Sequence, residues 1–380
     1  MPELDVVGIG NALVDVIAHA DDEFLDRHSL VKGAMSLIET DRAVDLYRAI
    51  SPAVEMSGGS AANTMVGIAS LGGRAGYVGK VRRDDLGNVF SHDMTAVGVR
   101  FRGGTTDAEL GTGRCIIVVT PDAERTMNTY LGISSLLSVD DLDEELIADA
   151  SVLYMEGYLF DRDAAKQAFR KAAEIAHANG RKVSLTLSDS FCVDRHREDF
   201  VALVRDDVDI LFGNEDEIVS LYETDSVEEA IAALRDQCDI SAITASAAGS
   251  YVVTADDVVT VAAEPVAKVL DTTGAGDLYA AGFLYGLTRG DSLPRCAEIG
   301  GIAAAEVISH VGPRPLVSLR TLVAVSEPCE RTIWWRCAQG GWRTPASRST
   351  AHGQVRRSRQ RAPSPSAGLP PNPTRTSETS

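Results

Sequence analysis

The chain has 380 residues, of which 44% are hydrophobic and 24% are charged, which is ordinary for a globular protein. This length accommodates one large domain, or one domain with a small appendage. The sequence has no apolar run of membrane-spanning length and enters its first strand without a basic leader, so we expect a cytoplasmic protein. The six cysteines are scattered without Cys-x-x-Cys spacing, which argues against a disulfide framework and against a zinc site.

The formal net charge of −19 is the sum of two segments of opposite character. Residues 331–380 contain nine arginines, no lysine and one acidic residue, a balance of +8, so residues 1–330 carry −27 by subtraction. This acidic body argues against nucleic acid as a partner. Any phosphate ligand must therefore be held by local N–H groups, by Mg²⁺ and by a few side-chain cations.

Short apolar runs alternate with helix-like stretches along most of the chain. Residues 4–10 form an apolar run that ends in glycines and predicts a buried first strand. Further strands are predicted at residues 75–80, 151–155, 182–187, 208–211 and 240–244, and helices at residues 84–97, 164–178, 197–204, 215–222 and 292–310. Such alternation indicates an α/β fold with a mostly parallel sheet covered on both faces.

A second, smaller sheet is predicted beside this core. Residues 11–18 continue the first strand's apolar run in near-alternation, with Asp15 among apolar neighbours, and residues 34–38 form a short strand before a helix at residues 41–50. Residues 114–120 and 125–131, which Pro121-Asp122-Ala123-Glu124 separates, indicate a β-hairpin. We therefore expect a small β-sheet lid built from about residues 12–39 and 100–131.

The segment Asp271-Thr-Thr-Gly-Ala-Gly-Asp277 directly precedes a run with helical spacing. Gly274, Ala275 and Gly276 are expected to present unpaired N–H groups at the helix N-terminus, where the helix dipole favours an anion. Asp277 falls in the first helical turn, where a carboxylate would repel phosphate, so a base that removes a proton from an attacking hydroxyl is the better interpretation. The alternative is an ordinary helix start that Asp277 stabilises.

This heptapeptide resembles the second signature of the PfkB (ribokinase-like) family of sugar and nucleoside kinases, and residues 57–79 resemble the first signature. The resemblance extends from residue 4 to about residue 322. It implies a kinase domain over residues 1–326, with a three-layer α/β/α core and a β-sheet lid. It also implies transfer of the γ-phosphoryl group of ATP to a primary hydroxyl, with Mg²⁺ as cofactor and Asp277 as the base.

The resemblance assigns Asn11, Asp15, Gly58, Gly59 and Asn63 to the acceptor site. From the residues alone, Asp15 could equally be a turn or edge-strand aspartate, and paired glycines before a helix could be turn chemistry. In the family, however, the aspartate at the position of Asp15 accepts hydrogen bonds from sugar hydroxyls, and the residues at Gly59 and Asn63 hold the acceptor.

The acceptor is less well specified than the reaction. The patterns from Asn11 to Asp15 and from Asp271 to Asp277 are most similar to bacterial adenosine-kinase-like members, so phosphorylation of adenosine to AMP is the first hypothesis. Tyr158 or Leu131 could supply an apolar wall for a purine, or belong to the core. A sugar kinase of the ribose or fructose type is the alternative, followed by a catalytically idle nucleoside-binding protein.

The nucleotide side of the site is predicted from further matches. Asn214 and Glu217 match the family's Asn-x-x-Glu motif, which organises Mg²⁺ through water, although both are also typical of a helix N-cap. Thr244, Gly249 and Thr273 are expected to border the nucleotide, but Ser246 stands where relatives have a glycine. Residues 308–313 resemble the loop that, together with Asp271, binds a monovalent cation such as K⁺ in some relatives.

The resemblance ends near residue 323, and the composition changes at the same point. All three tryptophans and six of the fourteen prolines lie in residues 331–380, which have no apolar periodicity. We expect residues 327–380 to be a disordered basic tail. The loss of lysine and the appearance of tryptophan also suggest translation in a shifted reading frame, which DNA sequencing would test. Relatives occur as monomers and as dimers, with the lid as interface in some.

Overall fold

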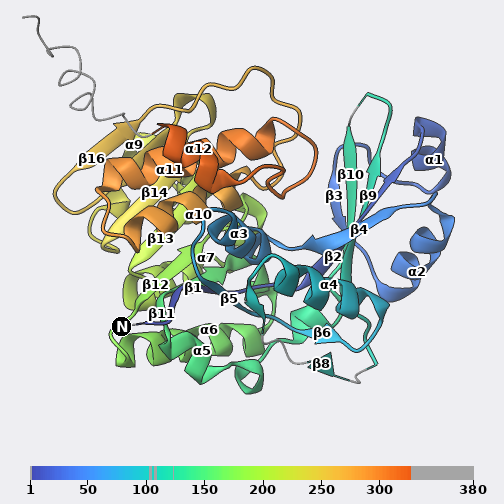
Figure 1. The fold of residues 1–380 in the computed structure, drawn as a ribbon, viewed down its shortest axis with the longest axis horizontal. Coiled ribbons are helices and arrows are strands. Elements are labelled where there is room, and N and C mark those ends of the chain that lie inside the picture. Colours follow the sequence, from blue (N-terminus) through green and yellow to red (C-terminus); the bar gives the residue numbers. More distant parts are fainter. Residues whose placement is uncertain (1, 102–104, 107–108, 123, 327–380) are drawn as a thin grey trace, which may run out of the picture. The chain divides into compact units, whose positions relative to one another are not determined.

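The computed structural model describes residues 2–101, 105–106, 109–122 and 124–326, and the basic segment 327–380 lies outside the described residues. The larger sheet has nine strands in the order β16-β15-β14-β13-β12-β11-β1-β5-β7 (Figure 1). Their bounds are β1 Leu4–Ile9, β5 Ala75–Val78, β7 Arg100–Phe101, β11 Ala150–Glu156, β12 Lys182–Thr186, β13 Ile210–Asn214, β14 Ile240–Thr244, β15 Ser250–Val253 and β16 Val258–Val261. Neighbouring strands pair in parallel, except that β14 pairs antiparallel with β15 and β15 pairs antiparallel with β16.

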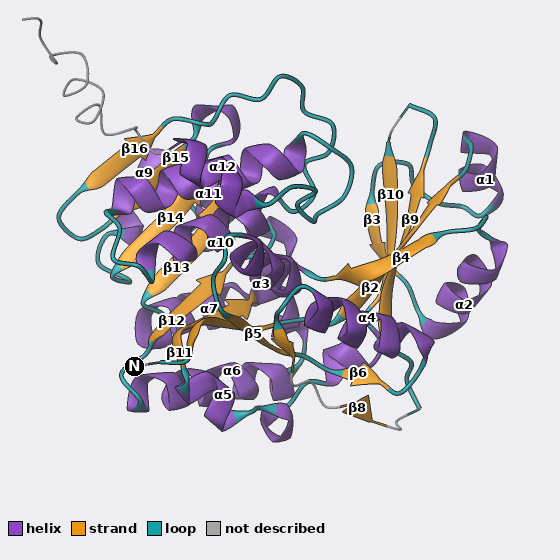
Figure 2. Ribbon diagram, in the orientation of Figure 1, coloured by secondary structure: helices purple, strands orange, loops and turns teal. Residues whose placement is uncertain are grey.

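Helices pack on both faces of this sheet, which gives three layers (Figure 2). One face is covered mainly by α5 Glu144–Ala148, α6 Asp163–Ala178, α7 Ser190–Asp207, α8 Glu215–Tyr222 and α9 Val227–Leu234. The other face is covered mainly by α3 Ser60–Ser70, α4 Asp85–Ala96, α10 Ala275–Leu287 and α11 Leu293–Ile308, and α12 Leu319–Ser326 packs against α11.

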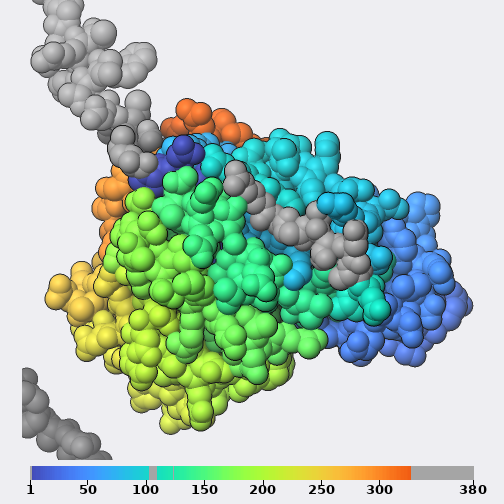
Figure 3. All heavy atoms as spheres, turned by 90° about the horizontal axis from the view of Figure 1, so that it is seen from below, coloured from blue at the N-terminus to red at the C-terminus, as the bar shows by residue number. Residues whose placement is uncertain are grey.

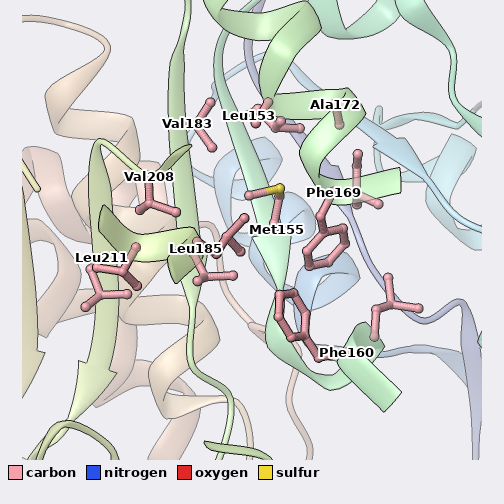
Figure 4. Packing of buried hydrophobic residues seen from close by; sticks show 14 of the residues in the cluster. Leu153, Met155, Phe160, Phe169, Ala172, Val183, Leu185, Val208 and Leu211 are labelled. Atoms are coloured by element: carbon pink, nitrogen blue, oxygen red, sulfur yellow. The ribbon is translucent and has the colours of Figure 1, made fainter. Parts of the chain in front are cut away.

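Strand β11 shows why the central strands are apolar throughout. Leu153 and Met155 lie in the same core cluster as Phe160, Phe169 and Ala172 on one face (Figure 4), while Val152 and Tyr154 join the core on the other face. Because successive side chains of a strand point to opposite faces, a sheet covered on both sides buries every residue. This explains why the central strands lack the alternation of polar and apolar residues that a half-exposed sheet shows.

The smaller sheet, which we call the lid, has five strands in the order β3-β10-β9-β2-β4. The strands are β2 Leu13–His19, β3 Met35–Leu37, β4 Val54–Gly58, β9 Gly113–Val119 and β10 Arg125–Tyr130, and the accompanying helices are α1 Asp22–Arg27 and α2 Thr40–Ala49. The predicted hairpin is confirmed, because β9 and β10 pair antiparallel. Strand β4 was not predicted, since its glycine and serine residues indicate a turn rather than a strand.

The predicted α/β fold with a mostly parallel sheet and a separate smaller sheet is confirmed, with differences in detail. Helix α7 begins at Ser190 rather than at residue 197, and it contains a break at His196 (φ −129°, ψ 24°) that interrupts its periodicity. The hairpin of β15 and β16 was not predicted. A further short pair, β6 Val81–Arg82 and β8 Thr105–Thr106, lies outside both main sheets.

The pairing of β1 with β11 brings together parts of the chain that are far apart in the sequence. In Figure 3 the middle of the chain (green) accordingly adjoins its N-terminal third (blue) on one face. Among the described residues, no helix is long and apolar enough to cross a membrane.

Candidate active site

Three predicted site residues and Glu156 follow or end strands whose carboxyl ends lie at the same edge of the larger sheet. Asn11 follows β1, Glu156 ends β11, Asn214 ends β13 and Thr244 ends β14. In an open parallel sheet, this edge is where ligands bind. The topology therefore gathers residues from four separate parts of the chain.

Helix α10 begins at this edge with the glycine-rich segment. Gly274 is its N-cap and has φ +81°, and a Cβ at this position would lie 2.9 Å from Pro313. Glycine is therefore required both by the backbone conformation and by the packing. The prediction that three N–H groups are unpaired is wrong for Ala275, whose N–H donates to the Thr272 carbonyl at 3.2 Å because the chain makes a turn there. The N–H groups of Gly274 and Gly276 have no such partner among the described residues.

Asp277 lies in the first turn of α10, and two residues of α3 hold its carboxylate. Ser60 Oγ donates to Oδ1 at 2.6 Å, and Asn63 Nδ2 donates to Oδ2 at 2.9 Å. Burial raises the pKa of Asp277, whereas both hydrogen bonds and the charge of Arg314 oppose that rise. The Oδ1 atom of Asn63 is buried and has no hydrogen-bond partner. The amide thus positions Asp277 with one end and leaves its other end available to a ligand hydroxyl.

Asp15 lies on lid strand β2 and is only 7% exposed. A Cβ at Gly58, on the paired strand β4, would lie 2.6 Å from its carboxylate oxygens, so the carboxylate lies directly over this glycine. No hydrogen bond to this carboxylate exists among the described residues. Burial raises the pKa of Asp15 to about 6, while Arg314 and Arg125 act in the opposite direction. A buried carboxylate without donors is suited to accept hydrogen bonds from a ligand.

Gly59 joins lid strand β4 to helix α3. It is the N-cap of α3 with φ +98°, and a Cβ there would collide with the carbonyl oxygen of Asn11. This close approach places the backbone of Asn11 beside the start of α3, which carries Asn63. The two glycines therefore act through the backbone geometry that they permit.

Glu156 is a buried acid of this site that the sequence analysis missed. Its Oε1 accepts hydrogen bonds from Asn11 N at 3.2 Å and Asn11 Nδ2 at 2.9 Å, and its Oε2 accepts from Ala61 N at 2.8 Å. Burial raises its pKa to about 7. An acid that ends an apolar strand and precedes a glycine was the signal available in the sequence. Glu156 thereby fixes Asn11 and the first turn of α3, next to Ser60 and Asn63.

Two partly buried arginines were also missed. Arg125, on lid strand β10, forms an ion pair with Asp271, whose other partners are Thr273 and Gly312. Although burial acts in the opposite direction, the hydrogen bonds from Thr273 and Gly312 lower the pKa of Asp271. Arg314 lies near Asp15 and Asp277 and is considered further below. Neither arginine stands in a motif, so only the tertiary structure reveals them.

Asn214 and Glu217 form a reciprocal cap at the N-terminus of α8. Glu217 N donates to Asn214 Oδ1 at 2.9 Å, and the Glu217 carboxylate accepts from Asn214 N at 3.1 Å and Nδ2 at 2.7 Å. Burial raises the pKa of Glu217 to about 7, and the nearby charges of Asp189 and Asp216 act in the same direction. Carboxylates that lack a positive partner are suited to a hydrated divalent cation, so this donor set fits Mg²⁺ held through water.

The loop after β14 contains the predicted nucleotide-side residues Thr244 and Gly249. Thr244 pairs with Asn214 across β13 and β14, and Gly249 has φ +102°. Ser246, which replaces the glycine of relatives, adopts φ +48°, in the left-handed region that favours glycine. Thr273 donates through N and Oγ1 to Asp271 Oδ1, at 3.0 and 2.7 Å, so its polar groups shape the loop before α10.

Tyr158 interacts electrostatically both with Asp277 on the acceptor side of the site and with Glu217 on the nucleotide side. It follows β11, its hydroxyl donates to the Ser188 carbonyl at 3.1 Å, and the charges of Asp277, Glu217 and Glu156 all act on it. Leu131 follows lid strand β10, next to the acceptor side.

Comparisons with known proteins agree with this geometry. The model of the pfkB family of carbohydrate kinases matches residues 35–319. The structure is similar to the adenosine kinase of Sinorhizobium meliloti, with 51% identity, a TM-score of 0.79, and coverage of 85% of this chain and 99% of that one. It is also similar to a probable sugar kinase of Rhizobium etli CFN 42, with 46% identity, a TM-score of 0.80, and coverage of 86% and 99%.

Among relatives compared by sequence, adenosine kinase 2 of Arabidopsis thaliana is 27% identical over 343 residues, which cover 81% of this chain and 94% of the relative. A 5-dehydro-2-deoxygluconokinase of Listeria monocytogenes is 29% identical over 264 residues, which cover 66% and 80%. The chain therefore belongs to the pfkB family of carbohydrate kinases and is a phosphotransferase.

Proposed function

We propose that the protein transfers the γ-phosphoryl group of ATP to the primary hydroxyl of adenosine and so forms AMP. The observation that carries the proposal is the pairing of Asp277 with Ser60 and Asn63, beside the N-terminus of α10 and the buried carboxylate of Asp15. A base, an anion-binding helix end and a carboxylate that can accept hydroxyl protons are the parts that phosphoryl transfer to an alcohol requires.

Each residue has a distinct part in this proposal. Asp15 accepts hydrogen bonds from the ribose hydroxyls, and the free Oδ1 of Asn63 accepts another. Asp277 takes the proton of the attacking hydroxyl, and its raised pKa brings the base closer to neutral pH, where proton transfer is efficient. The N–H groups of Gly274 and Gly276 stabilise the negative charge that develops on the transferred group.

Kinases of this family use ATP and Mg²⁺. Asn214 and Glu217 would hold the hydrated Mg²⁺, which neutralises charge on the phosphates when it is bound. Thr244 and Gly249 border the nucleotide in this proposal, and Thr273 supports the loop that leads into α10. The raised pKa of Glu217 is the observation in favour, because a nearby cation would relieve a buried negative charge.

The loop of residues 308–313 and Asp271 is where the resemblance places a monovalent cation such as K⁺. The Asp271 carboxylate, which would face that cation, already accepts hydrogen bonds from Thr273 and Gly312 and pairs with Arg125. The described residues thus give this carboxylate a positive partner of its own. We therefore propose turnover without a monovalent cation, which assays in K⁺ and in tetramethylammonium buffers would test.

A free-sugar kinase is the second candidate. The similarity to a probable sugar kinase at 46% identity supports it, and the same catalytic residues would serve both substrates. The similarity to an adenosine kinase at 51% identity favours a nucleoside.

The deciding experiment measures ADP release from MgATP with adenosine, inosine, guanosine, ribose, fructose or no acceptor. Stimulation by adenosine alone is expected. Stimulation by ribose or fructose alone would preserve the mechanism and replace the substrate. An absence of stimulation by every acceptor, from protein that binds ATP, would favour the catalytically idle nucleoside-binding protein.

We further propose that two copies associate through their lids. Strands β3 and β4 are the two edges of the lid sheet, and Met35, Leu37 and Val54 on them are 46%, 55% and 61% exposed. Apolar side chains on open sheet edges favour pairing with another chain. Light scattering should detect a dimer, and Leu37→Arg should dissociate it; a monomeric parent protein would refute this part.

A further inference from the structure

Arg314 lies in the loop that follows α11, and its side chain connects the lid to the core. Its Nη2 donates to Ser57 O at 2.8 Å and to Ser57 Oγ at 3.2 Å, and its Nη1 donates to Ala62 O at 3.5 Å. Its Nε is buried and has no hydrogen-bond partner. The guanidinium therefore joins lid strand β4 to the first turns of α3.

The residues that Arg314 contacts are next to those that contact the site's carboxylates. Gly58, which follows Ser57, packs against the Asp15 carboxylate, and Asn63, which follows Ala62, donates to Asp277. Both carboxylates feel the charge of Arg314, which lowers the pKa of each against the effect of burial. Burial lowers the pKa of Arg314 itself to about 10, so the group remains a cation at neutral pH.

The surrounding loop holds Arg314 rigidly. Pro313 and Pro315 flank it and restrict the backbone on both sides. Pro313 packs against Gly274, and Gly312 N donates to Asp271 Oδ2 at 2.8 Å. Three consecutive residues of this loop thus contact the Asp271 carboxylate, the N-cap of α10 and the junction of β4 with α3.

We propose that Arg314 is a positioning residue for phosphoryl transfer: it supplies the positive charge that allows Asp15 and Asp277 to be negative together. The inference rests on the proposed role of Asp277 as the base. Other charged or titratable groups that interact electrostatically with Arg314 or with the two carboxylates are Asp93 of α4, Tyr77 of β5, Cys115 of β9, Arg125 of β10, Tyr154 and Glu156 of β11, and Tyr158, which follows β11. Asp93 is partly exposed, and its Oδ2 accepts a hydrogen bond from Ser57 N at 2.8 Å.

The test is the pH profile of kcat with saturating MgATP and adenosine, or with whichever acceptor the panel identifies. The acid limb of this profile, over which kcat rises with pH, reports the pKa of Asp277. Arg314→Met should move this limb upward by about one pH unit, because a nearby cation lowers a carboxylate pKa by roughly this amount or more. Arg314→Lys should keep the limb near its original position. Asp93→Asn should move the acid limb downward by a smaller amount, because the negative charge of Asp93 no longer offsets the positive charge of Arg314 that acts on Asp277.

Arg320→Met is the matched control, since Arg320 is exposed on the neighbouring helix α12. The acid limb of this variant's pH profile should not move. A merely structural role for Arg314 would lower kcat without displacing the limb, and that result would overturn the proposal. If Arg314→Met does not fold, Asp93→Asn decides, and an unmoved limb there would equally overturn it. Asp277→Asn separates the two questions: an active Asp277→Asn enzyme refutes the base itself, whereas an inactive one leaves the role of Arg314 to the pH profiles.

Discussion

Asn63 Nδ2 donates a 2.9 Å hydrogen bond to Asp277 Oδ2 across 214 positions of sequence. The bond fixes the orientation of the carboxylate at the start of α10, while Oδ1 of the same amide stays unpaired. One side chain thus joins the first signature to the second. This relationship makes the two glycine-rich segments a single site.

Replacing Asp277 with Asn should lower kcat by about 10²- to 10⁴-fold, which is the usual contribution of a general base. ATP affinity should change little, because the N–H groups of α10 remain. Turnover and nucleotide binding, measured by ADP release and by calorimetry, check the two parts separately. Asp256→Asn, on an exposed turn between β15 and β16, is the control and should leave both unchanged. Near-normal turnover in Asp277→Asn would remove Asp277 as the base.

Replacing Asp15 with Asn should weaken acceptor binding and stabilise the free protein. The pKa of Asp15 is higher in the folded state, at about 6, than the ordinary value of 3.8. Folding therefore favours the protonated form, so the stability that this group contributes is present below pH 4 and is lost as the pH rises through about 6. At pH 8, Asp15→Asn should raise the free energy of unfolding by on the order of 2 kcal/mol.

Urea denaturation of the free protein at pH 4.5 and pH 8 measures this effect. The gain from Asp15→Asn should be larger at pH 8, whereas Asp26→Asn on exposed helix α1 should show no such difference. Equal gains at both pH values would contradict the titration of Asp15 in this range.

Replacing Arg125 with Met should uncouple the lid from the loop that precedes α10. The change leaves the Asp271 carboxylate without its cation, since within the described part of the chain Thr273 and Gly312 alone still donate to it. We expect kcat/KM for the acceptor to fall at least about tenfold, as removal of a buried, hydrogen-bonded charge partner costs roughly 2 kcal/mol or more. Acceptor-independent ATP hydrolysis should rise relative to turnover, because the lid excludes water less well.

Arg114→Met is the control for this change. Arg114 lies on the adjacent lid strand β9, and its guanidinium lies over the rings of Tyr47 and Tyr130. If Arg125→Met and Asp271→Asn have independent effects in a double-mutant cycle, the ion pair has no part in closure.

Replacing Ser246 with Gly should stabilise the protein. Ser246 has φ +48°, which costs a residue with a Cβ roughly 1–2 kcal/mol, while glycine loses about 0.5–1 kcal/mol more in backbone entropy on folding. A net gain of up to about 1 kcal/mol is expected in thermal or urea unfolding. Ala247→Gly, in the same turn but without positive φ, should instead destabilise. A loss of stability in Ser246→Gly would show that the serine hydroxyl has a role beyond the backbone.

The sequence by itself determined the class of fold and the two signatures. Apolar runs alternating with helical stretches identify a parallel sheet because periodicity is a local property. The segments from Ser57 to Asn63 and from Asp271 to Asp277 are recognisable because small residues are required wherever backbone must approach a ligand. The structure also confirms the predicted positions of Asp277 in the first turn of α10 and of Asn214 at the start of α8, because the start of a helix is a local pattern.

The tertiary structure alone decided which other charges join this site. Arg125 and Arg314 come from β10 and the loop after α11, and no local pattern distinguishes them from core or surface residues. Glu156 ends β11, and its one local signal is its position between an apolar strand and a glycine. Strand β4 was missed because its membership in the lid depends on pairing with β2 rather than on its own composition. Burial and the field of distant charges set the pKa values of Asp15 and Asp277, and both depend on contacts that form only when the chain folds.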